Sequence, residues 1–188
     1  TLDLSRYESG QGTVNYNSAT DQQWSKAMIF GVGCTGAGIE GSGCIDGGDV
    51  RNALGEEHMR GPHTIILAGC NGIKMSGFKV RRSANYAFLA YLLQKSAFSQ
   101  LTIEGGWDGI HVRGCRDVTI DGCKISTGDD AIAGGYWEKM NIRRCLLNSS
   151  CNGIRMIMPS TDLEVTDCHI YGPGKHEHIT SHRTNSEH

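Results

Sequence analysis

Proline, aromatic residues and long apolar runs are all scarce in this chain. Of its 188 residues, 3 are proline and 7% are aromatic, so the chain does not have the composition of a disordered, proline-rich protein. No apolar run approaches the roughly 20 residues that span a bilayer, which argues against a membrane segment. The 18 basic residues are spread thinly and form pairs such as Arg81-Arg82 rather than a patch, so nucleic acid is not an expected partner.

The two ends of the chain also lack clear signals. Residues 1–5 have neither the basic stretch nor the apolar run of a signal peptide, so we expect none in this chain. Residues 1–27 are rich in Ser, Asn and Gln without any period, and we expect an irregular N-terminal segment there. Residues 28–175 carry the repeat described below and form the expected main domain, and residues 176–188 form a polar tail.

Glycine, in contrast, is abundant. Its 26 residues make up about 14% of the chain, against an average of roughly 7%. High glycine content together with many short β-branched runs suits tight turns that recur many times. The length is that of one domain with a core of its own.

A repeat of about 22 residues runs through most of the chain. Five units end on apolar residues that are 23, 22, 22 and 23 positions apart: Val80, Ile103, Ile125, Leu147 and Ile170. A leucine-rich repeat has a similar period, but here the apolar positions are mostly Ile, Val, Phe and Cys, with few helix-forming residues between them. We therefore predict an all-β fold with little α-helix: a right-handed, single-stranded parallel β-helix with Ile120, Ile142 and Val165 stacked inward.

Three cysteines follow the same period. Cys123, Cys145 and Cys168 are 22 and 23 residues apart, which places them in one interior column as small apolar side chains. Disulfide bonds need pairs with a specific geometry, which a single column does not favour. We therefore expect these three thiols to be free and buried.

A column of polar residues has this period too. Asp108, Asp130 and Asn152 are separated by 22 residues each, and Asn85 precedes Asp108 by 23. On a solenoid they stack on neighbouring rungs, about 4.8 Å apart. Carboxylates at that spacing repel each other, and Asp129 adds a third charge, so the column predicts a functional site. The alternative is structural: Asp residues also cap turns beside glycine, and Asn85 and Asn152 suit an amide ladder.

Three motifs resemble the polygalacturonase family of glycoside hydrolases. They are Trp107-Asp108-Gly109-Ile110, Thr127-Gly128-Asp129-Asp130-Ala131-Ile132 and the preceding segment Arg60-Gly61-Pro62-His63-Thr64-Ile65. The resemblance covers roughly residues 28–175. It implies a right-handed parallel β-helix that hydrolyses glycosidic bonds of acidic polysaccharides with inversion. The family has Gly-His-Gly where this chain has Cys151-Asn152-Gly153, and the absence of opening and closing rungs indicates a divergent bacterial member or a fragment.

The resemblance implies that Asp108, Asp129 and Asp130 are catalytic. Inversion needs a carboxylic acid for the leaving oxygen and a carboxylate to activate water, about 6.5–9.5 Å apart. Two rungs and the reach of the side chains can span that separation. Crowded carboxylates raise one another's pKa, so one of the three can stay protonated as the acid.

Five further residues are predicted to contact the sugar: Trp107, His111, Trp137, Asn152 and Arg155. Indole rings suit stacking on sugar rings, and the guanidinium fork can grip a carboxylate or a hydroxyl group. Core positions for the two tryptophans, and structural roles for His111 and Asn152, are the alternatives.

No cofactor and no metal are expected. The histidines of the tail lack a Cys-x-x-Cys partner and a strand context: His176, His178, His182 and His188. The implied partner is a polysaccharide or oligosaccharide, pectin-like or related, and the implied location is secreted or periplasmic. Two other functions stay open on this fold: a polysaccharide lyase or epimerase with His111 or Arg155 as base, and a non-catalytic carbohydrate-binding β-helix.

Overall fold

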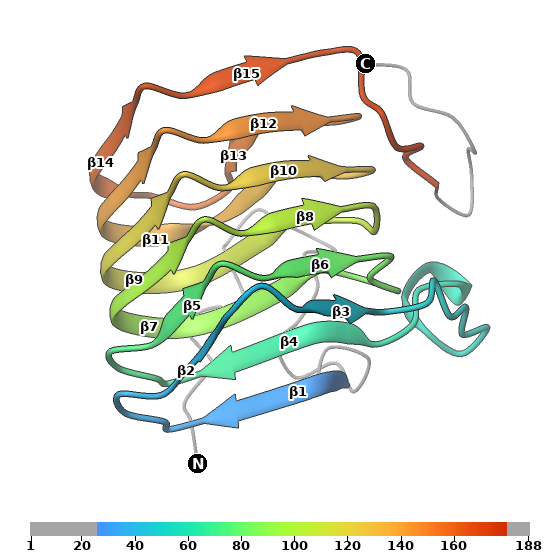
Figure 1. Ribbon diagram of the computed structural model, residues 1–188, viewed down its shortest axis with the longest axis horizontal. Coiled ribbons are helices and arrows are strands. Elements are labelled where there is room, and N and C mark those ends of the chain that lie inside the picture. The colour runs from blue at the N-terminus through green and yellow to red at the C-terminus, as the bar shows by residue number, and fades with distance from the viewer. Residues whose placement is uncertain (1–25, 180–188) are drawn as a thin grey trace.

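The computed structural model describes residues 26–179, and in that range the chain consists of strands and one 3-10 element, η2 (Glu56–His58). Figure 1 shows the strands stacked as the turns of a solenoid. In chain order they are β1 (Ala27–Val32), β2 (Gly38–Glu40), β3 (Cys44–Asp46), β4 (His63–Ala68), β5 (Lys74–Ser76), β6 (Lys79–Arg81), β7 (Phe88–Ser99), β8 (Thr102–Glu104), β9 (Ile110–Asp121), β10 (Lys124–Thr127), β11 (Ile132–Arg143), β12 (Leu146–Ser149), β13 (Ile154–Met156), β14 (Thr161–Thr166) and β15 (His169–Tyr171). No helix in this range is long and apolar enough to cross a membrane. The predicted all-β solenoid is confirmed. Of the irregular segment expected at residues 1–27, residues 1–25 lie outside the described residues and Ala27 belongs to β1.

Two parallel sheets run along the solenoid. One follows the order β1-β4-β7-β9-β11-β13 and the other β3-β6-β8-β10-β12-β15. Neighbouring turns pair at the period seen in the sequence, since Ile120 pairs with Ile142 and Ile142 pairs with Val165. The stacking predicted for these three residues is confirmed.

Each long strand bends at two positions where the backbone has a positive φ and the pairing is interrupted. The first of these positions in β7, β9 and β11 is Leu92, Gly114 and Tyr136, with φ of 55°, 73° and 53°. The ladder skips these positions and resumes on the next face, where Leu93 pairs with Cys115. Bulky residues rarely adopt positive φ, so the pairing of the rungs on either side holds Leu92 and Tyr136 in this conformation.

The interior is one apolar column. Ile120 and Ile142 are fully buried, whereas Val165 is 42% exposed because β14 pairs only with β11 among the described strands. Cys123 and Cys145 are buried, and all three cysteines of the column are free. The expectation that Cys168 is buried is wrong, since it lies half-buried on the last described turn.

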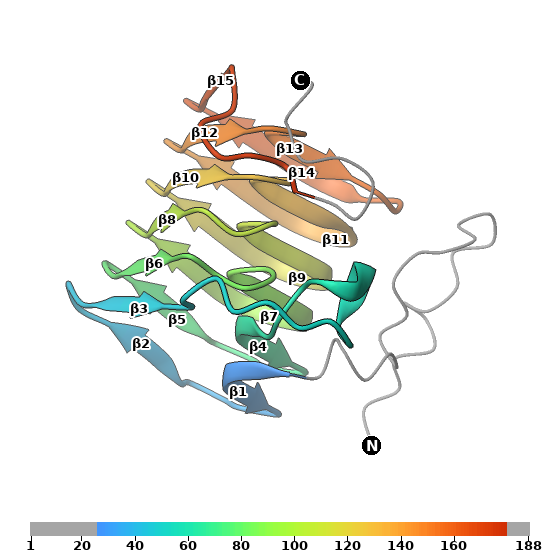
Figure 2. The same cartoon turned by 90° about the vertical axis from the view of Figure 1, so that its right-hand side faces the viewer.

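Two segments leave the stack on the same side of the solenoid. One is the excursion at residues 48–62, which contains η2. The other is the segment at residues 172–179, which follows β15. Figures 1 and 2 place both on the side where β10 and β12 end. This side also carries the predicted acids, so the two segments form the surroundings of the site.

The core column predicts a graded loss of stability on truncation. Ile142→Ala should lower the free energy of unfolding by about 2–5 kcal/mol, because it leaves a cavity between two covered rungs. Val165→Ala, on the less covered rung of the same column, should cost less than half as much. Urea denaturation of both variants measures the difference. Equal losses would show that the two positions are equally packed and would contradict the difference in burial between them.

Candidate active site

The three acidic residues lie in the short connections that lead into β9 and β11. Asp108 precedes β9, and Asp129 and Asp130 precede β11. One carboxylate oxygen of each lies within 4.8 Å of an oxygen of the other two. The backbone N–H of Asp130 donates to Asp108 Oδ1 at 3.3 Å and ties the two rungs together. The structure thus brings together the three residues predicted to be catalytic.

A bend in the connection separates the acid from the core. Asp130 and Ile132 have the same parity, so a straight strand would place both side chains on one face. In the structure Ile132 belongs to the apolar core, while the Asp130 carboxylate contacts the polar side chains of Asn152 and Arg155. The chain bends just before β11. Because of this bend, the Asp130 carboxylate points away from the core although Ile132 points into it.

Asp108 is held by a buried chain of polar side chains. His111 Nδ1 lies 2.6 Å from Asp108 Oδ2, and Arg113 Nε donates to His111 Nε2 at 3.2 Å. Burial lowers the pKa of His111 well below its usual value, and the charge of Arg113 adds to this. Because arginine can only donate, Nε2 accepts and the proton of the neutral ring sits on Nδ1. His111 therefore donates to Asp108.

Two more rings fix the position of His111. The Tyr86 ring stacks on it at 5.0 Å with an interplanar angle of 3°. His63 lies 5.1 Å from Tyr86 on centroids, and its Nδ1 accepts the Tyr86 backbone N–H at 3.2 Å. Burial lowers the pKa of His63 to about 3, so it too is neutral. His111 is thus a packed residue that also contacts an acid.

The three carboxyl groups differ in protonation. Burial raises the pKa of Asp108 well above its usual value, and the charges of Asp129 and Asp130 raise it further. Burial and the Asp129 charge also raise the pKa of Asp130. Burial acts on Asp129 in the same direction, but the hydrogen bond with His178 and the charge of Arg60 outweigh it and lower that pKa. An ionised Asp129 therefore lies beside two acids that hold protons more tightly.

Asp130 contacts two residues predicted to bind the sugar. Asn152 Nδ2 donates to Asp130 Oδ1 at 2.6 Å, and Arg155 Nη1 donates to Oδ2 at 3.3 Å. Both come from the next turn, where Ala133 of β11 pairs with Arg155 of β13. The Arg155 side chain is 44% exposed, so it lies between solvent and the buried acid.

Three residues at the cluster were not among the predicted site residues. Arg60 Nη2 lies 3.5 Å from Asp129 Oδ2, and its guanidinium lies 5.1 Å from the centre of the Trp107 ring. His178 Nε2 lies 3.6 Å from the same oxygen, and its Nδ1 lies 3.0 Å from Cys151 Sγ. The 22-residue step from Asp129 could have identified Cys151. Arg60 and His178 lie on segments outside the repeat, where spacing carries no signal.

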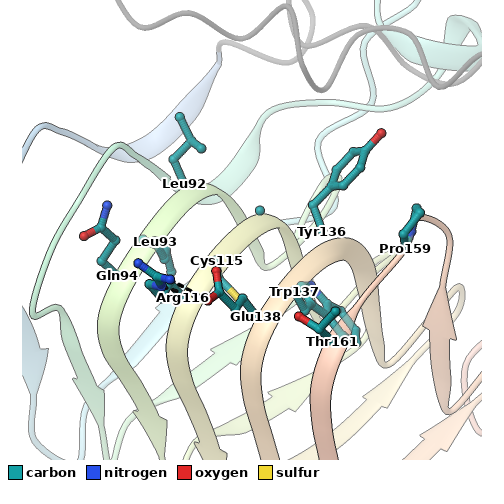
Figure 3. Close-up of a pocket in the computed structure, with 11 residues that line it drawn as sticks. Leu92, Leu93, Gln94, Cys115, Arg116, Tyr136, Trp137, Glu138, Pro159 and Thr161 are labelled. Atoms are coloured by element: carbon teal, nitrogen blue, oxygen red, sulfur yellow. Dashed lines mark hydrogen bonds and ion pairs between the residues drawn. The ribbon is translucent and has the colours of Figure 1, made fainter.

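The two tryptophans have different positions. Trp107 is half-buried next to Arg60, and its indole N–H donates to the carbonyl of Ile179 at 3.0 Å. Trp137 is 1% exposed and donates to the carbonyl of Val112 at 2.9 Å. Figure 3 shows it in the wall of a pocket of about 530 Å³ whose lining contains none of the three acids. The prediction that Trp137 binds sugar is therefore corrected, because its ring belongs to the core.

A second pocket, of about 700 Å³, opens beside Trp107. Its charged lining comes from the excursion, the ends of β6 and β8, and the segment after β15: Asp49, Arg51, Arg81, Arg82, Glu104, Lys175 and Glu177. Guanidinium groups bind carboxylates in a fork, and an indole face suits a sugar ring. The pocket therefore offers groups that suit a sugar bearing an acid.

Two sets of described side chains have the spacing of metal ligands. The first is the three acids, and the second is Asp129, Cys151 and His178. In each set the ligand atoms lie within 4.8 Å of one another. Carboxylates alone suit hard cations, whereas a set with Cys and His suits zinc.

Comparison with known proteins finds relatives of the same architecture. A family model described as a right-handed β-helix region matches residues 63–185. A polygalacturonase from Saccharomyces cerevisiae is 28% identical over 148 residues, which is 71% of this chain and 41% of that protein. The crystal structure of a hyperthermoactive exopolygalacturonase from Thermotoga maritima has a TM-score of 0.64 at 15% identity and covers 74% of this chain and 45% of that one. The chain spans less than half the length of both relatives.

The buried acid predicts a pH-dependent stability difference. A carboxyl group whose pKa is raised on folding stabilises the protein fully below its unfolded pKa, near 3.8, and this contribution is lost as the pH rises through the folded value. Asp108→Asn removes the titration. The variant should therefore melt at the same or a higher temperature than the parent at neutral pH, with the difference shrinking toward pH 4.

Thermal melts between pH 4 and 8 measure this difference. Asp117→Asn is the matched control, because Asp117 is exposed on β9, the strand that follows Asp108, and its positive φ of 61° suits Asn equally. If the parent protein had a higher melting temperature than the Asp108→Asn variant at pH 8, the ionised Asp108 carboxylate would be stabilising and the prediction would be wrong.

Proposed function

Because this chain belongs to the right-handed β-helix family, we propose that it is a glycoside hydrolase of the polygalacturonase type, acting on a pectin-like polysaccharide. The relatives named as polygalacturonases support the reaction class. The observation that carries the proposal is the cluster of three carboxyl groups with unequal protonation. Glycoside hydrolysis needs both a proton donor and an ionised carboxylate at one bond.

The unequal pKa values support an assignment of roles. The pKa values of Asp108 and Asp130 are both raised, so in this proposal one of these two residues is the proton donor. Its proton passes to the glycosidic oxygen as the carbon–oxygen bond breaks. Asp129 stays ionised and takes a proton from the water that attacks the anomeric carbon. Arg155 and Asn152 position the acid pair, and Trp107 offers its ring to the sugar.

The charges around the site favour an acidic sugar. Arg60 and Arg155 approach the cluster from two sides, through contacts to Asp129 and Asp130. The pocket beside Trp107 adds further guanidinium groups. A uronate carboxylate can pair with these groups, although Arg81 and Arg82 also pair with Asp46. This charge pattern supports a polymer of uronic acids over a neutral glucan.

Substitution of the acids tests the reaction. Asp129→Asn and Asp130→Asn should each lower the release of reducing ends from polygalacturonate by about 10²–10⁴-fold, the usual loss for a general acid or base. Asp117→Asn is the control and should retain activity. The product should show no ultraviolet absorbance from a new carbon–carbon double bond. Such absorbance would establish a lyase, and binding without any cleavage would establish a carbohydrate-binding β-helix.

The stereochemistry is a separate question. The carboxylate oxygens lie within 4.8 Å, closer than the about 6.5–9.5 Å typical of inverting enzymes, so the proposal of inversion rests on the family resemblance. We expect the first product to carry the opposite anomeric configuration to the bond that was cleaved. Proton NMR of the first turnovers, before mutarotation, measures it. Retention would reject the inverting mechanism and would point to one carboxylate as a nucleophile.

A further inference from the structure

A cysteine, a histidine and an aspartate meet at one point next to the acids. Cys151 lies 22 residues after Asp129 and therefore one turn further along the solenoid. Its Sγ is 3.0 Å from His178 Nδ1, and His178 Nε2 is 3.6 Å from Asp129 Oδ2. The cysteine thiol also hydrogen-bonds to the Asp129 carboxylate and so helps lower its pKa. Each side chain of this cluster touches the other two.

The cluster is held from both sides. The backbone N–H of Cys151 donates to Ser149 Oγ at 2.8 Å. On the other side, Ser150 Oγ donates to the carbonyl of His176. Trp107 Nε1 donates to the carbonyl of Ile179 at 3.0 Å. Residues on both sides of His178 are therefore fixed to the solenoid, which positions its ring before any ligand arrives.

The segment that carries His178 also packs closely on the solenoid backbone. A Cβ added at Gly128, one residue before Asp129, would lie 2.3 Å from the carbonyl of Glu177. Only glycine leaves room for this approach. The side chain of His178 is nearly buried as a result. The close packing places an imidazole over a carboxylate and a thiol in a site with little exposure to solvent.

We propose that Asp129, Cys151 and His178 form a binding site for one zinc-like divalent transition-metal ion. Zinc takes Cys, His and Asp ligands at about 2.0–2.3 Å, so tetrahedral ligand atoms lie about 3.3–3.6 Å apart. The ligand atoms here lie within 4.8 Å of one another, so small side-chain rotations close the site. Three protein ligands leave a fourth position for water or a sugar hydroxyl.

The charges at the site balance on binding. Cys151 loses its thiol proton to solvent as the metal–sulfur bond forms, and the thiolate and the carboxylate then neutralise the dication. Arg60 Nη2 lies 3.5 Å from Asp129 Oδ2 and therefore opposes a cation bound there, but the same nitrogen also pairs with Glu57 Oε1 at 3.1 Å. Because the thiol must be deprotonated, affinity should fall as the pH is lowered.

Bound metal would affect the acids directly. The ion would coordinate the carboxylate of Asp129 and would hold the segment that carries His178 across the site. This consequence rests on the proposed function, whereas the binding itself does not. Zinc should then inhibit hydrolysis by occupying the ionised carboxylate.

Cobalt(II) tests the binding without any assay of activity. The purified, reduced chain should take up one cobalt ion with a tetrahedral visible spectrum and a thiolate-to-cobalt charge-transfer band, and zinc should bleach both. Cys151→Ser should abolish the charge-transfer band. His178→Gln should weaken binding by more than the roughly 10–100-fold lost when only an outer partner of a ligand is removed.

Two substitutions serve as matched controls. Cys44→Ser and His169→Gln change an exposed cysteine and an exposed histidine on the solenoid, and both variants should bind cobalt like the parent. Circular dichroism and thermal melts confirm that all variants are folded. A charge-transfer band that persists in Cys151→Ser, or disappears in Cys44→Ser, would overturn the site.

Inhibition separates the two proposals. Zinc should lower the turnover of the parent protein. In the Cys151→Ser variant, turnover with zinc should be nearly equal to turnover without zinc. If cobalt binds as expected but zinc leaves turnover unchanged, the role of Asp129 in hydrolysis is wrong and the metal site stands. If no metal binds to the folded chain, the metal site is wrong and the hydrolase proposal is unaffected.

Discussion

Register between parallel rungs is the constraint on which the rest of this structure depends. Each turn hydrogen-bonds to the next through its backbone, and from β4 onward the paired residues are 22 or 23 positions apart. A side chain therefore stacks on its counterpart one turn away, about 4.8 Å along the axis. The same register that aligns Ile120 with Ile142 in the core also aligns Asp108 with Asp130 outside it. One geometric rule thus determines both the stability of the solenoid and the position of the acids.

The acids lower the stability of the folded solenoid. Burial and mutual repulsion raise the pKa values of Asp108 and Asp130, so their charged forms destabilise the fold. The surrounding groups offset part of that cost: Arg60 and His178 contact Asp129, and Arg155 and Asn152 contact Asp130. Groups that perturb one another in this way cluster at functional sites.

The two segments outside the repeat, residues 48–62 and 172–179, contribute side chains that contact Asp129. The excursion brings Arg60, and the segment after β15 brings His178 over Asp129. These contacts cover a carboxylate that a bare solenoid would expose. Both contacts involve the same oxygen, Asp129 Oδ2, and both favour its ionised form. The β-helix places the acids in one column, and the two covering segments lower the pKa of Asp129 through Arg60 and His178.

The period determined the solenoid, the stacking of Ile120 and Ile142 and the alignment of Asp108 with Asp130, because in a parallel coil the distance along the chain translates directly into a place on the next turn. The sequence also predicted that Asn152 and Arg155 lie near the acids, and the structure brings both to Asp130. It could not decide whether Trp137 faces the core or the solvent, since that depends on the corner at Tyr136. Only the tertiary structure placed Arg60 and His178 at the cluster. Their segments have no period, so their positions follow from contacts between residues far apart in the chain, which no local pattern records.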